Sequence, residues 1–151
     1  MTDMKFIDAL LIKKLIRPET YSPEVIHRHL VRARQDIQTA LRNMQFDDEI
    51  AYSIAYQAML RTGRALMFSF GYRPIDGQQH VTVVKFAEYV LGKQAENLID
   101  SFERMRRQRH SFWYESIEVI SRNDASTAIK RAELLVELVE KFVSQDNTKR
   151  G

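Results

Sequence analysis

Small and apolar residues recur every three or four positions along much of the chain. This spacing predicts amphipathic α-helices, because residues three and four apart lie on one face of a helix. Three such stripes are long enough to form a buried face. They are Ile26, Leu30, Ala33, Ile37, Ala40 and Met44; Ala51, Ala55, Ala58, Thr62 and Ala65; and Ile129, Ala132, Leu135, Val136, Val139 and Phe142. The small side chains of the second stripe let neighbouring helices approach closely, so we expect it to belong to a central helix.

Capping residues and helix breakers divide the chain into helix-length segments. We expect helices over Asp3–Arg17, from the Ser22–Pro23–Glu24 cap onward, from Asp47–Asp48 to about Phe70, over His80–Leu91, from Lys93 to about His110, and after a cap at Asp124 or Ser126. The three valines within His80–Leu91 would also suit a strand. The Tyr72–Gly77 stretch has the composition of a loop.

The scarcity of turn-forming residues supports an all-α fold. Five glycines and three prolines in 151 residues are too few for a β-sandwich or barrel, which needs a turn about every 8–12 residues. We therefore predict one domain over residues 1–151, an antiparallel bundle of five to six helices, with the last six or so residues as a disordered tail. No apolar run is long enough to span a membrane, and together with the absence of cysteine this favours a cytoplasmic protein.

Several kinds of site find no support in the sequence. The lack of cysteine excludes thiolate zinc sites and cysteine nucleophiles. His27 and His29 lie two apart on a predicted helix and face different directions, and no glycine-rich phosphate loop is present. We therefore expect no metal and no cofactor. The arginines at positions 28, 32 and 34 either extend an RNA surface or form an ordinary solvated face.

The basic segment over residues 102–115 stands out because some of its arginines share the apolar face of their helix. At about 100° per residue, Arg109 falls about 20° and Arg106 about 40° from the centre of that face. His110 lies near its edge, whereas Arg104 and Arg107 point to solvent. A guanidinium on an apolar face needs a partner, a cavity or an interface, because it cannot lose its charge. The alternative is that the helix ends near Arg107 and that the arginines are solvated or pair with Glu96, Asp100 or Glu103.

Basic and aromatic residues alternate at the end of this segment, a combination that holds single-stranded nucleic acid in many proteins. This pattern makes Arg104, Arg106, Arg107 and Trp113 candidates for nucleic-acid binding, although Trp113 also suits a core position.

Arg109–His110–Ser111–Phe112–Trp113–Tyr114 resembles the signature of HEPN domains (higher eukaryotes and prokaryotes nucleotide-binding). That signature has an arginine, a polar residue, three further residues and a histidine. The resemblance extends over the alanine-rich Ile50–Phe70 helix, the Gly71–Tyr72–Arg73–Pro74 turn with His80 shortly after it, and the final helix. It implies a homodimer with the two motifs facing each other and, in many members, a metal-independent endoribonuclease that acts as a toxin beside a nucleotidyltransferase antitoxin.

The resemblance also implies roles for three residues. Arg109 would hold the scissile phosphate, His110 would orient the reacting groups, and Tyr114 would occupy the acid–base position. Tyrosine has an ordinary pKa of about 10 against about 6.5 for histidine, so Tyr114 is the poorer base at neutral pH and His110 is its natural substitute. A looser register pairs Arg104 with His110.

Two functions follow from these residues. The first is an RNA- or nucleotide-binding protein with a ribonuclease site at a dimer interface around Arg109. The alternative is a non-catalytic helical module that binds a nucleotide or a partner protein such as a nucleotidyltransferase, with Tyr114 marking a decayed site. A bundle without any ligand is the third interpretation. How Phe112–Ser121 folds decides the geometry of the site.

Overall fold

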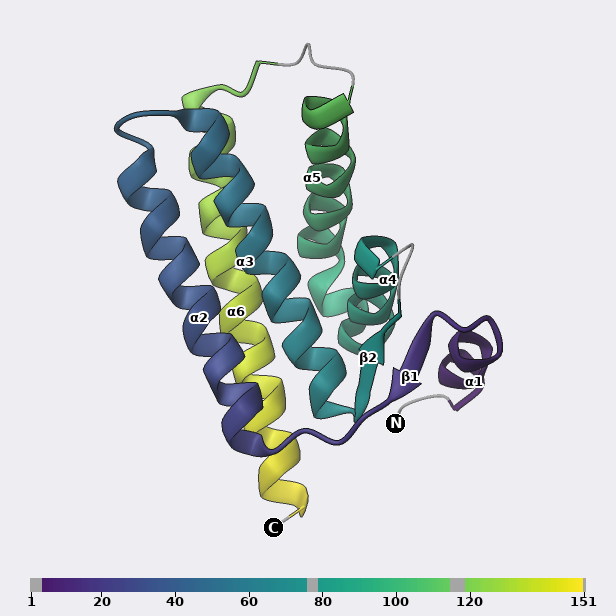
Figure 1. Cartoon of the computed structure of the whole chain (residues 1–151). Helices are drawn as coiled ribbons and strands as arrows, with labels where there is room; N and C mark the ends of the chain where they lie inside the picture. Colours follow the sequence, from purple (N-terminus) through teal and green to yellow (C-terminus); the bar gives the residue numbers. More distant parts are fainter. Residues whose placement is uncertain (1–3, 76–78, 115–118, 151) are drawn as a thin grey trace.

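The computed structural model describes the backbone of residues 4–75, 79–114 and 119–150, and the side chains of residues 5–75, 79–109 and 119–144. The described elements are α1 (Met4–Ile12), β1 (Ile16–Pro18), α2 (Pro23–Asn43), α3 (Asp48–Ser69), β2 (Tyr72–Pro74), α4 (Gln79–Leu91), the 3-10 helix η1 (Gly92–Ala95), α5 (Glu96–Tyr114) and α6 (Arg122–Arg150). The predicted all-α class is confirmed. Helices α2 and α5 run in one direction, and α3 and α6 run in the other (Figure 1).

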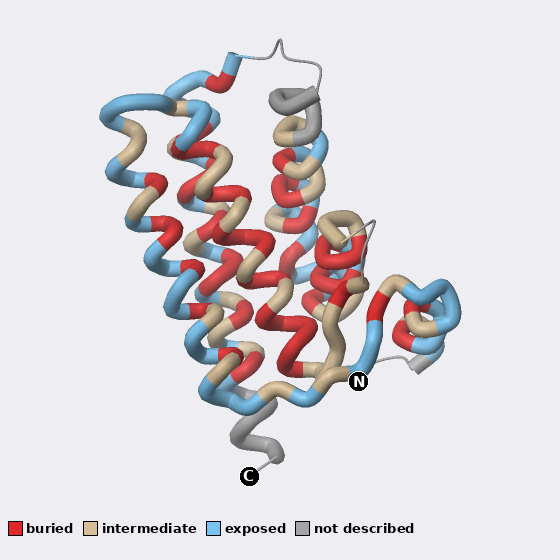
Figure 2. The backbone as a smooth tube through the Cα atoms, viewed as in Figure 1, coloured by how far each residue is buried: buried red, intermediate tan, exposed pale blue. Residues whose placement is uncertain are grey.

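Helix α3 is the centre of the bundle, as the stripe of small side chains predicts. It packs against α2, α4, α5, α6 and β2, and most of its residues are buried (Figure 2). All five residues of its stripe are buried. Gly63 is also buried in α3, where an added Cβ would overlap Val83 Cγ1 of α4. This glycine therefore sets the close approach of α3 and α4.

The N-terminal caps of the two long helices form as predicted. Ser22 accepts a hydrogen bond from the Val25 amide, and Asp47 accepts from the Glu49 and Ile50 amides. The stripe of α2 is buried, except that Met44 is partly exposed. The His80–Leu91 segment is helical, so the strand alternative is wrong.

The first segment departs from its prediction. Helix α1 ends at Ile12, and the chain turns at Lys14, whose φ of 58° lies in the left-handed region. Ile16–Pro18 then pairs antiparallel with Tyr72–Pro74, which we expected to be part of a loop. The pairing buries Ile16. The predicted helix over Asp3–Arg17 therefore forms only over Met4–Ile12 of the described residues, and the predicted loop at Tyr72–Gly77 begins with a strand, because pairing between distant segments overrides local propensity.

The bounds of two further helices differ from the prediction. Helix α5 begins at Glu96 after η1, rather than at Lys93, and continues past His110 to Tyr114. Helix α6 begins at Arg122, so neither Asp124 nor Ser126 is its cap. Instead the Ser121 Oγ accepts from the Asp124 amide and Asp124 accepts from the Ser121 amide, each at 3.0 Å, which is a capping box. The backbone of α6 is helical to Arg150, within the region expected to form a tail.

Among the residues that the structure describes, no helix has both the length and the apolar character needed to cross a membrane.

Candidate nucleic-acid site on α5

Helix α5 carries its arginines on the faces that the helical phase predicts. Arg106 and Arg109 are half-buried, whereas Arg104 and Arg107 are exposed. Because α5 continues to Tyr114, the alternative in which the helix ends near Arg107 is wrong. The Tyr52 hydroxyl of α3 donates a hydrogen bond to Gln108 Oε1 and fixes this part of α5 against the central helix.

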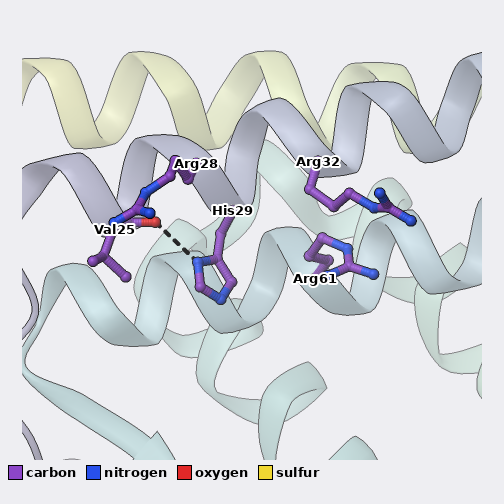
Figure 3. Close-up of a pocket in the computed structure, with 5 residues that line it drawn as sticks. All are labelled: Val25, Arg28, His29, Arg32 and Arg61. Atoms are coloured by element: carbon purple, nitrogen blue, oxygen red, sulfur yellow. Dashed lines mark hydrogen bonds between the residues drawn. The ribbon is translucent and has the colours of Figure 1, made fainter.

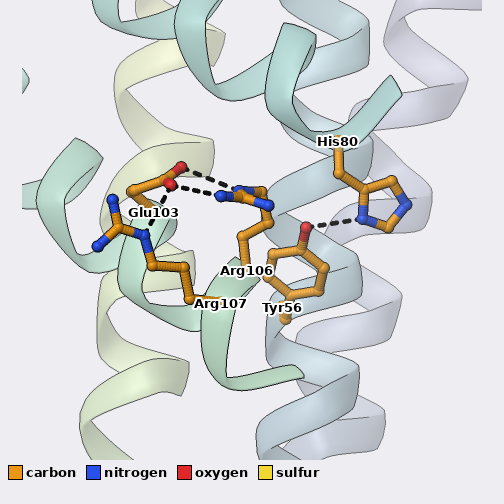
Figure 4. Close-up of polar contacts among 5 residues, drawn as sticks. All are labelled: Tyr56, His80, Glu103, Arg106 and Arg107. Atoms are coloured by element: carbon orange, nitrogen blue, oxygen red, sulfur yellow. Dashed lines mark hydrogen bonds and ion pairs between the residues drawn. The ribbon is translucent and has the colours of Figure 1, made fainter. Parts of the chain in front are cut away.

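Glu103 pairs with two of these arginines. Its carboxylate accepts from Arg106 Nε at 3.1 Å and Nη2 at 2.6 Å, and from Arg107 Nε at 3.1 Å (Figure 4). The hydrogen bonds from Arg106 are the main reason why the pKa of Glu103 lies below its ordinary value. The sequence suggested pairing of these arginines with Glu103 as one alternative. Arg106 and Arg107 do form ion pairs with Glu103, whereas Arg109 does not.

Arg109 lies over an aromatic ring. Its Cζ atom is 5.6 Å from the ring centroid of Tyr56, a residue of α3 that is fully buried. At this distance the guanidinium is attracted by the negative face of the ring. Within the described part of the chain, Arg109 forms no ion pair. Its charge is therefore held in place by packing, without a described carboxylate to neutralise it.

Tyr56 also links the arginines to a histidine. Its hydroxyl is hydrogen-bonded to His80 Nδ1 in the first turn of α4, at 2.8 Å (Figure 4). Burial raises the pKa of Tyr56 to about 12, against the opposing effect of the Arg109 and Arg106 charges. The phenol therefore keeps its proton across the neutral range.

The surroundings of His80 favour the neutral imidazole. Burial lowers its pKa below the ordinary value, and the positive charges of Arg109, Arg64 and Arg106 lower it further. In the tautomer that donates from Nδ1 to Tyr56, Nε2 is a proton acceptor. A neutral imidazole beside guanidinium groups can accept a proton while those groups hold an anion.

Arg64 of α3 adds a third guanidinium to this cluster. Its Nη2 donates to Gln79 Oε1 at 3.3 Å. Burial lowers the pKa of Arg64 below the ordinary value, and the positive charge of Arg61 lowers it further. The positive charges of Arg64, Arg106 and Arg109 all lower the pKa of His80, and the single negative charge of Glu103 offsets only part of them. The cluster is therefore suited to an anion.

The structure places the other predicted site residues less centrally. Arg104 lines a separate hollow of about 260 Å³ with Tyr52 and Arg131, and Arg107 extends into solvent from its contact with Glu103. His110, Trp113 and Tyr114 belong to α5, but their side chains lie outside the described residues. Of the Arg109–Tyr114 motif, only the Arg109 side chain is therefore placed.

Sequence reasoning missed Tyr56, Arg64 and His80 as site residues. Tyr56 and Arg64 are eight positions apart on α3, about 80° around the helix, and their neighbours suggested only a packing stripe. The sequence places His80 at the start of a helix and within the HEPN resemblance, without a role in the site. The signal that could have found it was a polar side chain in the first turn of a helix otherwise rich in apolar residues.

No group of three or more potential metal-binding histidine or acidic side chains occurs among the described residues.

Comparison with known proteins gives one assignment. The model of the HEPN domain matches residues 26–142, which include Tyr56, His80 and Arg109 and extend from α2 into α6. Comparison with curated proteins found no match. Because the matched region covers more than half of the chain, the chain belongs to the HEPN domain family.

Proposed function

We propose that the chain binds RNA or a nucleotide through the cluster formed by Arg109, Arg106, Arg64, Tyr56 and His80, and that it cleaves RNA without a metal. HEPN domains are helical domains that commonly bind nucleotides or RNA. The observation that carries the proposal is the half-buried Arg109 guanidinium, which is packed on Tyr56 and has no described carboxylate partner. Such a group is available to a phosphate.

The proposed reaction is attack of a ribose 2′-hydroxyl on the adjacent phosphorus. The new bond between the 2′-oxygen and phosphorus forms as the bond to the 5′-oxygen breaks, which leaves a 2′,3′-cyclic phosphate and a 5′-hydroxyl. Arg109 stabilises the negative charge on the phosphate oxygens. The family resemblance assigns the acid–base position to Tyr114 and the orienting role to His110. We add His80, in the tautomer that donates from Nδ1 to Tyr56, as the acceptor of the 2′-hydroxyl proton, because its surroundings favour the neutral imidazole and Tyr114 is a weak base near pH 7. The protonated Tyr114 phenol then donates the proton that the leaving 5′-oxygen needs.

We further propose that the site is completed in a homodimer, in which the two Arg109–Tyr114 segments face each other. HEPN domains commonly dimerise, which supports this arrangement. A nucleotidyltransferase antitoxin is the proposed partner of the ribonuclease, in a toxin–antitoxin pair. An adjacent reading frame for a nucleotidyltransferase would support that pairing.

The test is RNA binding and cleavage by Arg109→Ala. We expect native protein to bind labelled single-stranded RNA, to cleave it in the presence of EDTA, and to leave cyclic phosphate ends. Arg109→Ala should weaken binding about tenfold or more, because it removes a charge-assisted hydrogen bond. Arg42→Ala removes an equal charge from an exposed site on α2 and is the matched control. Unchanged binding by Arg109→Ala contradicts the proposal, and 5′-phosphate products or inhibition by EDTA contradict the mechanism.

The second candidate function is a non-catalytic interaction module. The tyrosine at position 114, where the family signature has histidine, favours it. RNA or nucleotide binding that depends on Arg109 without any cleavage would support this function over the first.

A further inference from the structure

A second basic site lies between α2 and α3. Val25, Arg28, His29, Arg32 and Arg61 line a hollow of about 310 Å³ there (Figure 3). On α3, Arg61 lies about 140° around the helix from Tyr56, so this α2–α3 groove opens on a different side of α3 from the Arg109 cluster. The groove is large enough for a phosphate with part of its attached group.

Asp36 orients two of the three arginines. Its carboxylate is buried and accepts from Arg61 Nε at 2.9 Å, and the second oxygen lies 3.5 Å from Arg32 Nε. Both contacts use Nε. Within the described part of the chain, the terminal nitrogens of Arg32 and Arg61 form no hydrogen bond. Asp36 therefore holds the Arg61 guanidinium by a hydrogen bond and attracts that of Arg32, while the terminal nitrogens of both stay available.

Arg28 and His29 complete the lining. Arg28 is exposed and forms no ion pair with a described residue, although Glu24 lies one helical turn before it. His29 is held by a 2.9 Å hydrogen bond between Nδ1 and the Val25 carbonyl oxygen, and its ring packs edge-on against Phe68 with 5.0 Å between the centroids. The imidazole therefore has a fixed orientation in the groove.

The charge in the groove exceeds what a structural role needs. Three arginines line the groove and one carboxylate pairs with two of them, so positive charge exceeds negative charge by two among these four side chains. A single guanidinium would be enough to neutralise Asp36, and like charges held close together repel each other. A phosphate group, with its negative charge and several acceptor oxygens, would offset this repulsion, and the planar arginine fork matches such a group.

We propose that the α2–α3 groove is a phosphate-binding site, separate from the Arg109 cluster. Its ligand carries a phosphate either as the dianion of a small phosphomonoester or as part of an RNA backbone. Arg32 and Arg61 present their terminal nitrogens to the phosphate oxygens, and Arg28 adds positive charge at the Val25 end of the groove (Figure 3). The site does not depend on the proposed ribonuclease activity.

The experiment is an NMR titration of the full chain with sodium phosphate, with ionic strength kept constant by sodium chloride. We expect saturable shifts of the amide signals of residues 25–32 and of Arg61. Arg28→Ala/Arg32→Ala should weaken this binding about tenfold or more, because it removes charge-assisted hydrogen bonds. Arg61 is left intact, since its removal would deprive buried Asp36 of its closest partner. Arg42→Ala, on the same helix, should change the affinity less than about twofold.

Conservative variants separate the arginine fork from charge alone. Arg28→Lys/Arg32→Lys keeps the charge but loses the bidentate geometry, so its affinity should lie between those of the native and alanine proteins. Absence of saturable shifts in the groove, or native affinity in the double alanine variant, overturns the proposal.

Two further titrations identify the source of the phosphate. Saturation by a nucleoside 5′-monophosphate, without shifts from single-stranded RNA, assigns a small phosphomonoester. Shifts of the same amides by RNA, lost in Arg28→Ala/Arg32→Ala, assign the RNA backbone. Arg109→Ala should leave the groove titration unchanged, so failure of the proposed ribonuclease and failure of this site are distinguishable. Arg109→Ala protein that no longer binds phosphate in the groove contradicts a separate site.

Discussion

His80 is packed beside Tyr56 in surroundings that keep its imidazole neutral. Burial and the nearby arginine charges hold the pKa of His80 below that of a histidine in the unfolded chain. Between these two pKa values the unfolded state binds more protons than the folded state. The free energy of unfolding should therefore fall as the pH drops below about 6.5, and this contribution should be constant well above that pH.

The corresponding measurement is urea unfolding at pH 7.5 and pH 5.5. We expect His80→Gln to lose less stability than native protein on this change, because glutamine does not titrate and can still hydrogen-bond to Tyr56. His27→Gln replaces an exposed histidine of α2 and is the control. Equal pH dependence in native and His80→Gln proteins would contradict the assignment.

The burial of the α5 arginines could be predicted from the sequence, whereas their contacts could not. The half-buried positions of Arg106 and Arg109 follow from helical phase alone, because α5 supplies both the apolar stripe and the arginines. The contact of Arg109 with Tyr56, and that of Tyr56 with His80, joins three helices. Such contacts depend on how the helices pack, so no spacing within one helix predicts them.

At the scale of elements, the packing of α3 on α4 depends on Gly63. An added Cβ would overlap Val83 Cγ1 and lie 3.6 Å from Phe102 Cε2. Val83 is fully buried and β-branched, so it has little freedom to move aside. We expect Gly63→Ala to destabilise the fold by about 1–3 kcal/mol through overpacking. This loss should exceed the gain of about 0.5–1 kcal/mol from replacing a helical glycine.

Thermal or urea unfolding can test this prediction with a double-mutant cycle. Introducing Gly63→Ala into a Val83→Ala background should cost much less than in native protein, because the overlapping methyl group is gone. A Gly63→Ala protein more stable than native, or an equal cost in both backgrounds, would show that the close approach of α3 and α4 is unimportant.

The elements differ in how much of their structure is encoded locally. Helices α2 and α3 contain their own capping residues and apolar stripes. Their sequences therefore predict both that each helix forms and where it begins. Strands β1 and β2 have three residues each and exist through their mutual pairing. The predicted start of α6 is wrong because Asp124 is a typical N-cap residue. In the structure Asp124 lies in the first turn of α6 and accepts a hydrogen bond from the Ser121 amide.

At the scale of the molecule, the proposed site needs a second copy of the chain. We expect a particle of twice 17.8 kDa by analytical ultracentrifugation. The facing surfaces would both carry the Arg106–Arg109 cluster, and their repulsion is screened by salt. The dimer fraction should therefore rise with ionic strength or with added RNA. A monomer at all salt and RNA concentrations would contradict the composite site.

The absence of cysteine from the chain allows the geometry of the dimer to be measured directly. Arg107 and Gln38 are exposed on α5 and α2, respectively, so each can be replaced by cysteine and spin-labelled without disturbing the core. If the two Arg109–Tyr114 segments face each other across a two-fold axis, labels at position 107 should lie close together and labels at position 38 far apart. The distances can be obtained by pulsed electron paramagnetic resonance. A shorter distance between labels at 38 than at 107 would place the dimer interface on α2 and would remove the second Arg109 from the site.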